Sequence, residues 1–172
     1  MKSRISLQKT DITKLSVDAI VNAANTSLLG GGGVDGAIHR GAGPELLEEC
    51  RTLGGCKTGE AKITKGYRLP AKWIIHTVGP IWRGGGSQEH LLLANCYRSC
   101  FDLAFKFGLR RLAFPAISCG IYGFPVEEAC EVACRETAAA LRSNENIRKV
   151  IFACFGDDIF SAYQSRLDYF DD

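Results

Sequence analysis

The sequence lacks any long apolar run. No stretch of its 172 residues approaches the ~20 apolar residues that a membrane-spanning helix requires. Its first ten residues also lack a basic segment followed by an apolar one, so they do not resemble a secretion signal. We therefore expect a cytoplasmic protein that does not associate with membranes.

An excess of charge of either sign is lacking as well. The formal net charge is only +2, and the Lys and Arg residues are scattered along the chain. Domains that bind nucleic acids typically concentrate basic residues on one face, so the composition does not favour a nucleic-acid partner. An RNA-binding regulator stays open as an alternative, and any anion that the protein binds must be held by local groups.

Metal-binding motifs are missing too. The pairs Cys96/Cys100 and Cys130/Cys134 have helical spacing, but no Cys-x-x-Cys or His-x-x-x-His sequence accompanies them. We expect the eight cysteines to be reduced, mostly buried thiols, and we predict neither a metal nor an organic cofactor. The sequence shows no chemical companion for His76, which favours a core or surface role.

The overall composition, with 46% hydrophobic and 23% charged residues, is typical of one globular domain. We therefore expect a single domain over residues 1–172. Short apolar runs predict buried strands at 5–7, 19–21, 74–78, 112–114 and 150–155. Helical patterns cover 44–51, 91–107, 126–141 and 157–167. This alternation of strands and helices predicts a three-layer α/β/α domain.

Two glycine-rich segments directly follow predicted strands, where open α/β sheets place their ligands. The first spans residues 28–36 and contains four successive glycines, and the second spans residues 115–125. Glycines let backbone amides approach a ligand, and amides at a helix start attract anions. A simple flexible turn is the alternative for the first segment. Neither segment has the nucleotide triphosphatase or dehydrogenase pattern, and two such loops would suit a diphosphate between two sugars.

Polar side chains lie on both sides of the first glycine run. Asn22 and Asn25 stand at the end of a predicted strand, where they could shape a turn or bind vicinal ribose hydroxyls. Asp35 could orient or deprotonate a water molecule. His39 would share a helical face with Asp35 if the helix begins by that residue. The residues alone leave both the structural and the functional interpretation open.

Together these motifs resemble the macrodomain family, and in particular its MacroD-type ADP-ribosyl hydrolases and O-acetyl-ADP-ribose deacetylases. The resemblance covers most of the chain and rests on residues 11–15, 17–25, 28–39, 42–44, 76–80, 117–125 and 150–155. It implies a three-layer macrodomain with a mixed central sheet. It also implies a hydrolase that binds ADP-ribose and cleaves an ester at the distal ribose.

The resemblance implies a partner that contains ADP-ribose, either a free small molecule or a mono-ADP-ribosylated protein, and we expect a monomer. The ester could be the acetyl group of O-acetyl-ADP-ribose or a bond to an acidic side chain. A module that binds ADP-ribose without turning it over is the main alternative. The sequence does not decide between the two esters.

The resemblance also implies individual roles. Asp11 and Ile12 would contact adenine, on which Phe155 would stack. Asn25 would hold the distal ribose, while Asp35 would position or activate the attacking water. Support of the pocket would come from Asn22 and His39. The diphosphate and distal ribose would be wrapped by Gly33, Val34, Ser118, Cys119, Gly120, Ile121 and Tyr122.

Three positions depart from the family pattern. Thr10 stands where glycine is usual, Cys119 where threonine is usual, and Phe155 lacks the hydroxyl of the frequent tyrosine. We expect Thr10 to alter the turn into Asp11. Backbone contacts and ring stacking do not depend on the other two changes, so we expect them to persist.

Overall fold

The computed structural model describes residues 1–172 and contains one six-stranded sheet. The strand order is β1-β6-β5-β2-β4-β3. All neighbouring strands are parallel except β3 and β4, which are antiparallel. The expected mixed sheet is therefore confirmed. Its strands are β1 (Ile5–Lys9), β2 (Ala19–Ala23), β3 (Ala61–Lys65), β4 (Trp73–Thr77), β5 (Arg111–Phe114) and β6 (Lys149–Cys154).

The chain also forms five α-helices and three short 3-10 helices. The four helices expected from apolar periodicity all form, with ends within three residues of the predicted ones, and a further helix begins directly in the glycine run. The helices are α1 (Gly33–Ala42), α2 (Pro44–Arg51), α3 (Glu89–Lys106), α4 (Val126–Ser143), α5 (Asp157–Gln164), η1 (Lys2–Arg4), η2 (Ile12–Lys14) and η3 (Leu167–Phe170).

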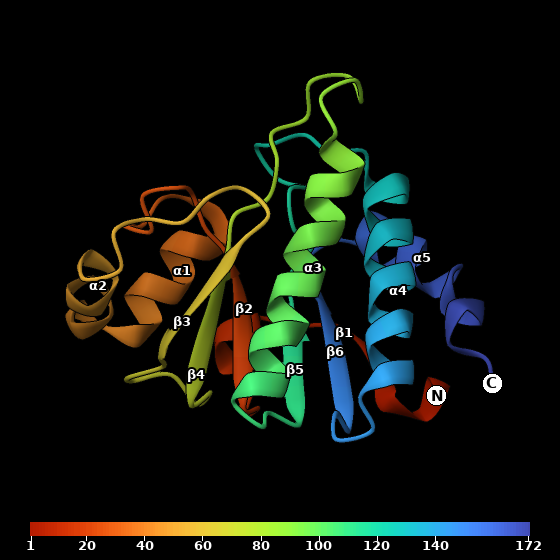
Figure 1. Ribbon diagram of the computed structural model, residues 1–172, viewed down its shortest axis with the longest axis horizontal. Coiled ribbons are helices and arrows are strands. Elements are labelled where there is room, and N and C mark those ends of the chain that lie inside the picture. The colour runs from red at the N-terminus through yellow and green to blue at the C-terminus, as the bar shows by residue number, and fades with distance from the viewer.

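Helices cover both faces of the sheet, and Figure 1 shows α3 and α4 crossing one of them. The alternation of side chains along a strand divides the core accordingly. In β6, Val150 and Phe152 pack with the helices α3, α4 and α5, whereas Ile151 and Ala153 belong to the second cluster, together with α1 and α2. The three layers follow from strands that are apolar on both faces.

Two sequence expectations need correction. The strand β3 was not expected, because its sequence, Ala-Lys-Ile-Thr-Lys, has few apolar residues. It lies at the edge of the sheet, where lysines are common because they discourage further strand pairing. The last strand also ends at Cys154 rather than at Phe155, so the ring of Phe155 lies beyond the sheet.

The cysteines are all free thiols, and seven of the eight are buried. No group of three or more His, Cys, Asp or Glu side chains is placed to hold a metal ion. None of the helices combines the length and the apolar character that crossing a membrane would demand.

Candidate active site

A cavity of about 360 Å³ opens at the carboxyl ends of the parallel strands, the edge at which open α/β sheets bind ligands. Each of β1, β6, β5 and β2 contributes the segment that follows it. We call residues 24–32 the first loop and residues 115–125 the second loop. The lining comprises Thr10, Ile12, Ala23, Ala24, Asn25, Gly31, Gly32, Gly33, Val34, Asp35, Gly79, Pro115, Ala116, Ser118, Cys119, Gly120, Ile121, Tyr122, Ala153, Phe155 and Ile159.

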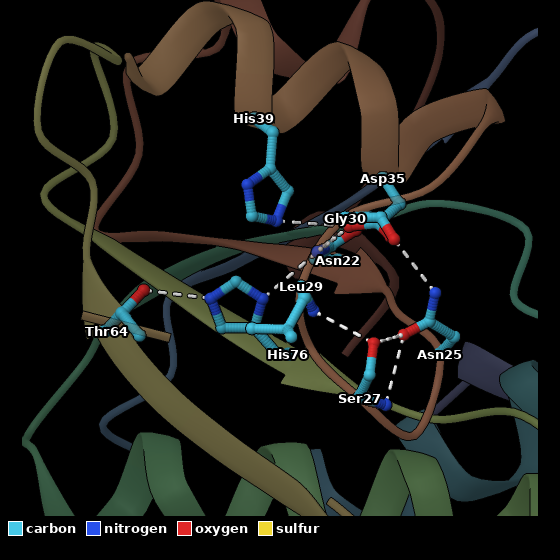
Figure 2. A network of polar contacts seen from close by, with 9 residues as sticks. All are labelled: Asn22, Asn25, Ser27, Leu29, Gly30, Asp35, His39, Thr64 and His76. Carbon is cyan, nitrogen blue, oxygen red and sulfur yellow. Dashed lines mark hydrogen bonds and ion pairs between the residues drawn. The ribbon is translucent and has the colours of Figure 1, made fainter. Parts of the chain in front are cut away.

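The first loop is closed by its own side chains, as Figure 2 shows. Asn25 Nδ2 donates to the carbonyl of Gly30 at 2.9 Å, while Asn25 Oδ1 accepts from the backbone amide and hydroxyl of Ser27 at 3.1 and 2.6 Å. Ser27 Oγ in turn accepts from the amide of Leu29 at 3.1 Å. Asn25 thus shapes the loop and still has one Nδ2 hydrogen to offer to a ligand.

Two glycines of the first glycine-rich segment, residues 28–36, lie close to other groups of the site. A Cβ at Gly36 would lie 2.6 Å from the carbonyl oxygen of Gly31, so only glycine allows α1 to approach the first loop this closely. A Cβ at Gly31 would lie 3.2 Å from Asp35 Oδ2 and 3.4 Å from Asn25 Nδ2. The carboxylate and the amide therefore face the same spot, which stays open because Gly31 has no side chain.

The carboxylate of Asp35 is held by one oxygen. Asp35 lies in the first turn of α1 and is only 5% exposed. Its Oδ1 accepts a 2.9 Å hydrogen bond from Asn22 Nδ2, and His39 Nε2 lies 3.5 Å from the same oxygen without hydrogen-bond geometry. Oδ2 makes no hydrogen bond within the protein and faces Gly31 at the cavity. One oxygen is thus fixed and the other is available to a substrate or a water.

Behind Asp35, a set of hydrogen-bonded, buried side chains crosses the sheet (Figure 2): Asn22 on β2, His76 on β4 and Thr64 on β3. Asn22 Nδ2 also donates to His76 Nδ1 at 3.0 Å, and His76 Nε2 lies 2.8 Å from Thr64 Oγ1. Burial, with a smaller contribution from nearby His39, lowers the pKa of His76 to about 3, so the ring is neutral near pH 7. Asn22 Oδ1 is buried without a partner, which costs about 1–3 kcal/mol.

The second loop rests on the segment that follows β4. Ser118 adopts a left-handed backbone conformation, with φ +66°, and its Oγ donates to the carbonyl of Pro80 at 2.8 Å. The amide of Trp82 donates to the carbonyl of Tyr122 at 2.8 Å, and the Trp82 ring packs on Phe124 with centroids 4.8 Å apart. The loop therefore keeps its shape through contacts with residues about 40 positions earlier in the chain.

Glu89 fixes that supporting segment. Its two carboxylate oxygens accept from the backbone amides of Arg83, Gly85 and Ser87 at 2.9, 2.9 and 2.6 Å. Burial alone would raise the pKa of Glu89, but these hydrogen bonds outweigh it and lower the pKa to about 2. The carboxylate acts as a charged centre around which residues 83–87 turn.

Apolar side chains stand at the mouth of the cavity. Ile121 of the second loop is 96% exposed and Phe155 is 79% exposed, which is typical of groups that meet a ligand rather than the core. Cys119 also lines the cavity. Burial, followed by the charge of Asp158, raises the pKa of its thiol to about 12. Cys119 is therefore protonated near pH 7 and is not a nucleophile.

Most of the candidate residues from the sequence come together in this cavity. Three of them do not line it: Asp11, Asn22 and His39. The residues that do are Ile12, Asn25, Gly33, Val34, Asp35, Ser118, Cys119, Gly120, Ile121, Tyr122 and Phe155.

Asp11 is exposed beside the cavity, between the lining residues Thr10 and Ile12. Its Oδ1 caps η2 by accepting from the hydroxyl and the amide of Thr13, and these bonds lower the pKa of Asp11. Oδ2 makes no hydrogen bond, so the carboxylate can still accept one from a ligand.

Asn22 and His39 lie behind Asp35, where they contact the carboxylate rather than the cavity. Their position agrees with a role in supporting the pocket, and neither lines the cavity as a substrate-binding residue would. The sequence predicted a core or surface role for His76 without a companion, and the structure places it in the core, where it does have companions, Asn22 and Thr64. Only the pairing of β2 with β4 and of β4 with β3 brings these residues together.

Known proteins resemble this chain over nearly its whole length. The model of the Macro domain family matches residues 21–133. The macro domain-containing protein CT2219 of Chlorobaculum tepidum is 63% identical over 159 residues, which are 92% of each chain. The ADP-ribose glycohydrolase MACROD2 of Xenopus laevis is 56% identical over 97% of this chain and 40% of its own length. A Trypanosoma brucei macrodomain, solved in complex with ADP-ribose, has a TM-score of 0.90 at 48% identity and covers 95% of this chain and 69% of its own.

The sheet and its two glycine-rich loops define an α/β domain that binds its ligand at the carboxyl ends of parallel strands. Since the family model matches well over half of the chain, and relatives match nearly all of it, the chain belongs to the macro domain family.

Proposed function

We propose that this protein is a hydrolase that binds ADP-ribose in the cavity and cleaves an ester bond at the distal ribose. The observation that carries this proposal is the carboxylate of Asp35, with Oδ1 held by Asn22 and Oδ2 facing Asn25 across the open space at Gly31. The names of similar proteins support it, because one is an ADP-ribose glycohydrolase and another was solved with ADP-ribose.

The strand order supports a defined orientation for the ligand. Ile12 follows β1 and Phe155 follows β6, so an adenine ring would lie at that end, within reach of Asp11. The second loop follows β5, where its backbone amides would bind the diphosphate. Asn25 follows β2 and would meet the distal ribose. Three strand spacings separate β1 from β2, or roughly 14 Å, which suits a ligand made of two sugars joined by a diphosphate.

The chemistry follows from the free oxygen of Asp35. A water molecule near Gly31 would donate a proton to Asp35 Oδ2 while its oxygen attacks the acyl carbon of the ester. The bond between the acyl carbon and the ribose oxygen would then break, and the ribose oxygen would take the proton back from Asp35. The products would be ADP-ribose and a carboxylic acid. Asn25 would orient the ribose, so part of the rate would come from positioning. A phosphate oxygen of the substrate would assist the proton transfer.

The test uses the purified protein after treatment with a chelator, incubated separately with O-acetyl-ADP-ribose and with a protein that carries ADP-ribose on an acidic side chain. We expect release of ADP-ribose from at least one substrate without added metal. Calorimetry should also show tighter binding of ADP-ribose than of adenosine, because only the former reaches both loops. Binding of ADP-ribose with no hydrolysis of either ester would instead establish a binding module.

A further inference from the structure

A continuous line of hydrogen bonds joins the edge of the sheet to the candidate catalytic carboxylate. It begins at Thr64 on β3, passes through His76 on β4 and Asn22 on β2, and ends at Asp35 on α1. All four side chains are buried, with residue exposures between 0% and 5%. Figure 2 shows the line running from Thr64 to Asp35 behind the first loop.

Each member of this line fixes the hydrogen-bonding role of the next. Thr64 Oγ1 donates to the carbonyl of Lys65 at 3.2 Å, so its oxygen is free to accept from His76 Nε2–H. With its proton on Nε2, the neutral ring has an accepting Nδ1. That nitrogen requires a donor from Asn22, which therefore presents its NH₂ group rather than its oxygen.

The NH₂ group of Asn22 has one hydrogen for His76 and one for Asp35. If the amide were turned over, Asn22 Oδ1 would face Asp35 Oδ1, and two acceptors would meet in a buried place. The amide keeps its orientation although Asn22 Oδ1 is left without a partner. Asp35 and a His76 ring protonated on Nε2 therefore require the same orientation of the Asn22 amide.

We propose that Thr64 and His76 are positioning residues for the hydrolysis: by holding His76 in its Nε2–H form, Thr64 keeps the NH₂ group of Asn22 against Asp35. This inference rests on the proposed function. It assigns a role in catalysis to a hydroxyl on the edge strand, which does not line the cavity.

Other titratable groups surround Asp35 and must be kept constant in a test. His39 approaches from the same helix, at 3.5 Å, and Cys50 lies on α2. Burial, with smaller contributions from the charges of Glu49 and Asp35, raises the pKa of Cys50 to about 11, so its thiol is neutral near pH 7. Both residues are retained in the variants below.

Thr64→Val tests the proposal, because valine keeps the shape of threonine but offers no acceptor to His76 Nε2–H. Because the buried Nε2–H then lacks a partner, we expect the proton to move to Nδ1, where it can donate to Asn22 Oδ1. This turns the Asn22 amide over and sets its oxygen against Asp35. We expect kcat near pH 7 to fall about tenfold, with KM changed less than about twofold. The acidic limb of the kcat profile should move to higher pH by about one unit, because the carboxylate gains a proton more readily beside an acceptor.

Two variants separate this effect from simple loss of a buried hydroxyl. Thr64→Ser restores the acceptor and should restore both kcat and the pH profile. Thr77→Val removes a buried hydroxyl that donates to the carbonyl of Glu60 at 2.9 Å, one residue from His76 and outside the line. It should lower the melting temperature without moving the acidic limb. The proposal is overturned if Thr64→Val leaves the limb in place, or if Thr77→Val moves it equally.

The nitrogen signals of His76 give a readout independent of turnover. In the unmutated protein, NMR should show a protonated Nε2 and a bare Nδ1, and in Thr64→Val the reverse. A protonated Nδ1 in the unmutated protein overturns the positioning role even if the enzyme is active. An unmutated protein that hydrolyses neither ester overturns the proposed function and, with it, the catalytic part of this inference.

Discussion

The first loop is held together by its own side chains, whereas the second loop rests on a neighbouring segment. Asn25 and Ser27 close the first loop through bonds that span no more than five residues. The second loop takes its shape from Pro80 and Trp82, which come from a distant part of the chain. The first loop also brings the carboxylate of Asp35 to the cavity, while the second offers backbone amides and the exposed Ile121. The difference suggests that the first loop serves mainly the chemical step and the second loop mainly the binding of the ligand.

The largest expected effect comes from removing the carboxylate on the first-loop side. Asp35→Ala should lower kcat by about 10²-fold or more, the range of general-base contributions. ADP-ribose should still bind, because the second loop is untouched. Single-turnover kinetics and calorimetry measure the two effects separately. Asp102→Ala, which removes an exposed carboxylate on α3, is the control and should change neither. An active enzyme in which Asp35→Ala keeps full activity would remove Asp35 from the mechanism.

A smaller effect should follow when the space between the two catalytic groups is narrowed. Gly31→Ala places a methyl group 3.2 Å from Asp35 Oδ2 and 3.4 Å from Asn25 Nδ2, at a residue whose backbone needs no positive φ. We expect kcat to fall about tenfold, because a small displacement of the reacting groups slows the chemical step. The melting temperature should change little. Gly86→Ala meets open space outside the cavity and serves as the control. Equal activity in both variants would show that the spot beside Gly31 is not where the reaction occurs.

The second loop should respond in affinity instead. Ser118→Ala removes the bond to the buried carbonyl of Pro80, which should weaken ADP-ribose binding by about 1 kcal/mol, or about fivefold. The rate constant of the chemical step should change less. Ser143→Ala removes a similar bond, to Ala140 at 3.1 Å, at an exposed helix end and should leave affinity unchanged. If Ser118→Ala lowers the single-turnover rate more than the affinity, the division between the loops is wrong.

The same contrast explains how much could be predicted from the sequence. The first loop and its helix depend on short-range features, such as the glycine run and the spacing of Asp35 and His39. Five of the six strands and four of the helices also follow from local periodicity. These features were predictable because residues close in sequence generate them.

The supporting groups were not predictable in this way. His76 reaches Asn22 across 54 positions and Thr64 across 12, and only the sheet order makes them neighbours. The edge strand β3 that carries Thr64 has too little apolar character to be identified. Glu89 reads as an ordinary acidic residue in the first turn of α3. Nothing in the sequence indicates that three backbone amides turn toward it.

Glu89 provides the last prediction, because it makes the support of the second loop depend on a charge, whereas the Asn25 and Ser27 bonds of the first loop are uncharged. Hydrogen bonds lower its pKa from about 4.5 to about 2. A group whose pKa is depressed by folding stabilises the protein above its ordinary pKa, and this contribution is lost as the pH falls toward the folded value. Glu89→Gln cannot accept from all three amides through charged oxygens, so it should melt at a lower temperature than the unmutated protein at pH 7.

The difference in melting temperature between the two proteins should shrink as the pH falls from about 4.5 toward 2, because the unmutated carboxylate then gains its proton. Glu145→Gln, at an exposed position between α4 and β6, should match the unmutated protein throughout. Thermal melts of the three proteins at half-unit intervals from pH 7 to pH 2.5 would measure this. A constant difference over the whole range would mean that the charge of Glu89 does not support the segment. The second loop would then depend on uncharged contacts, as the first loop does.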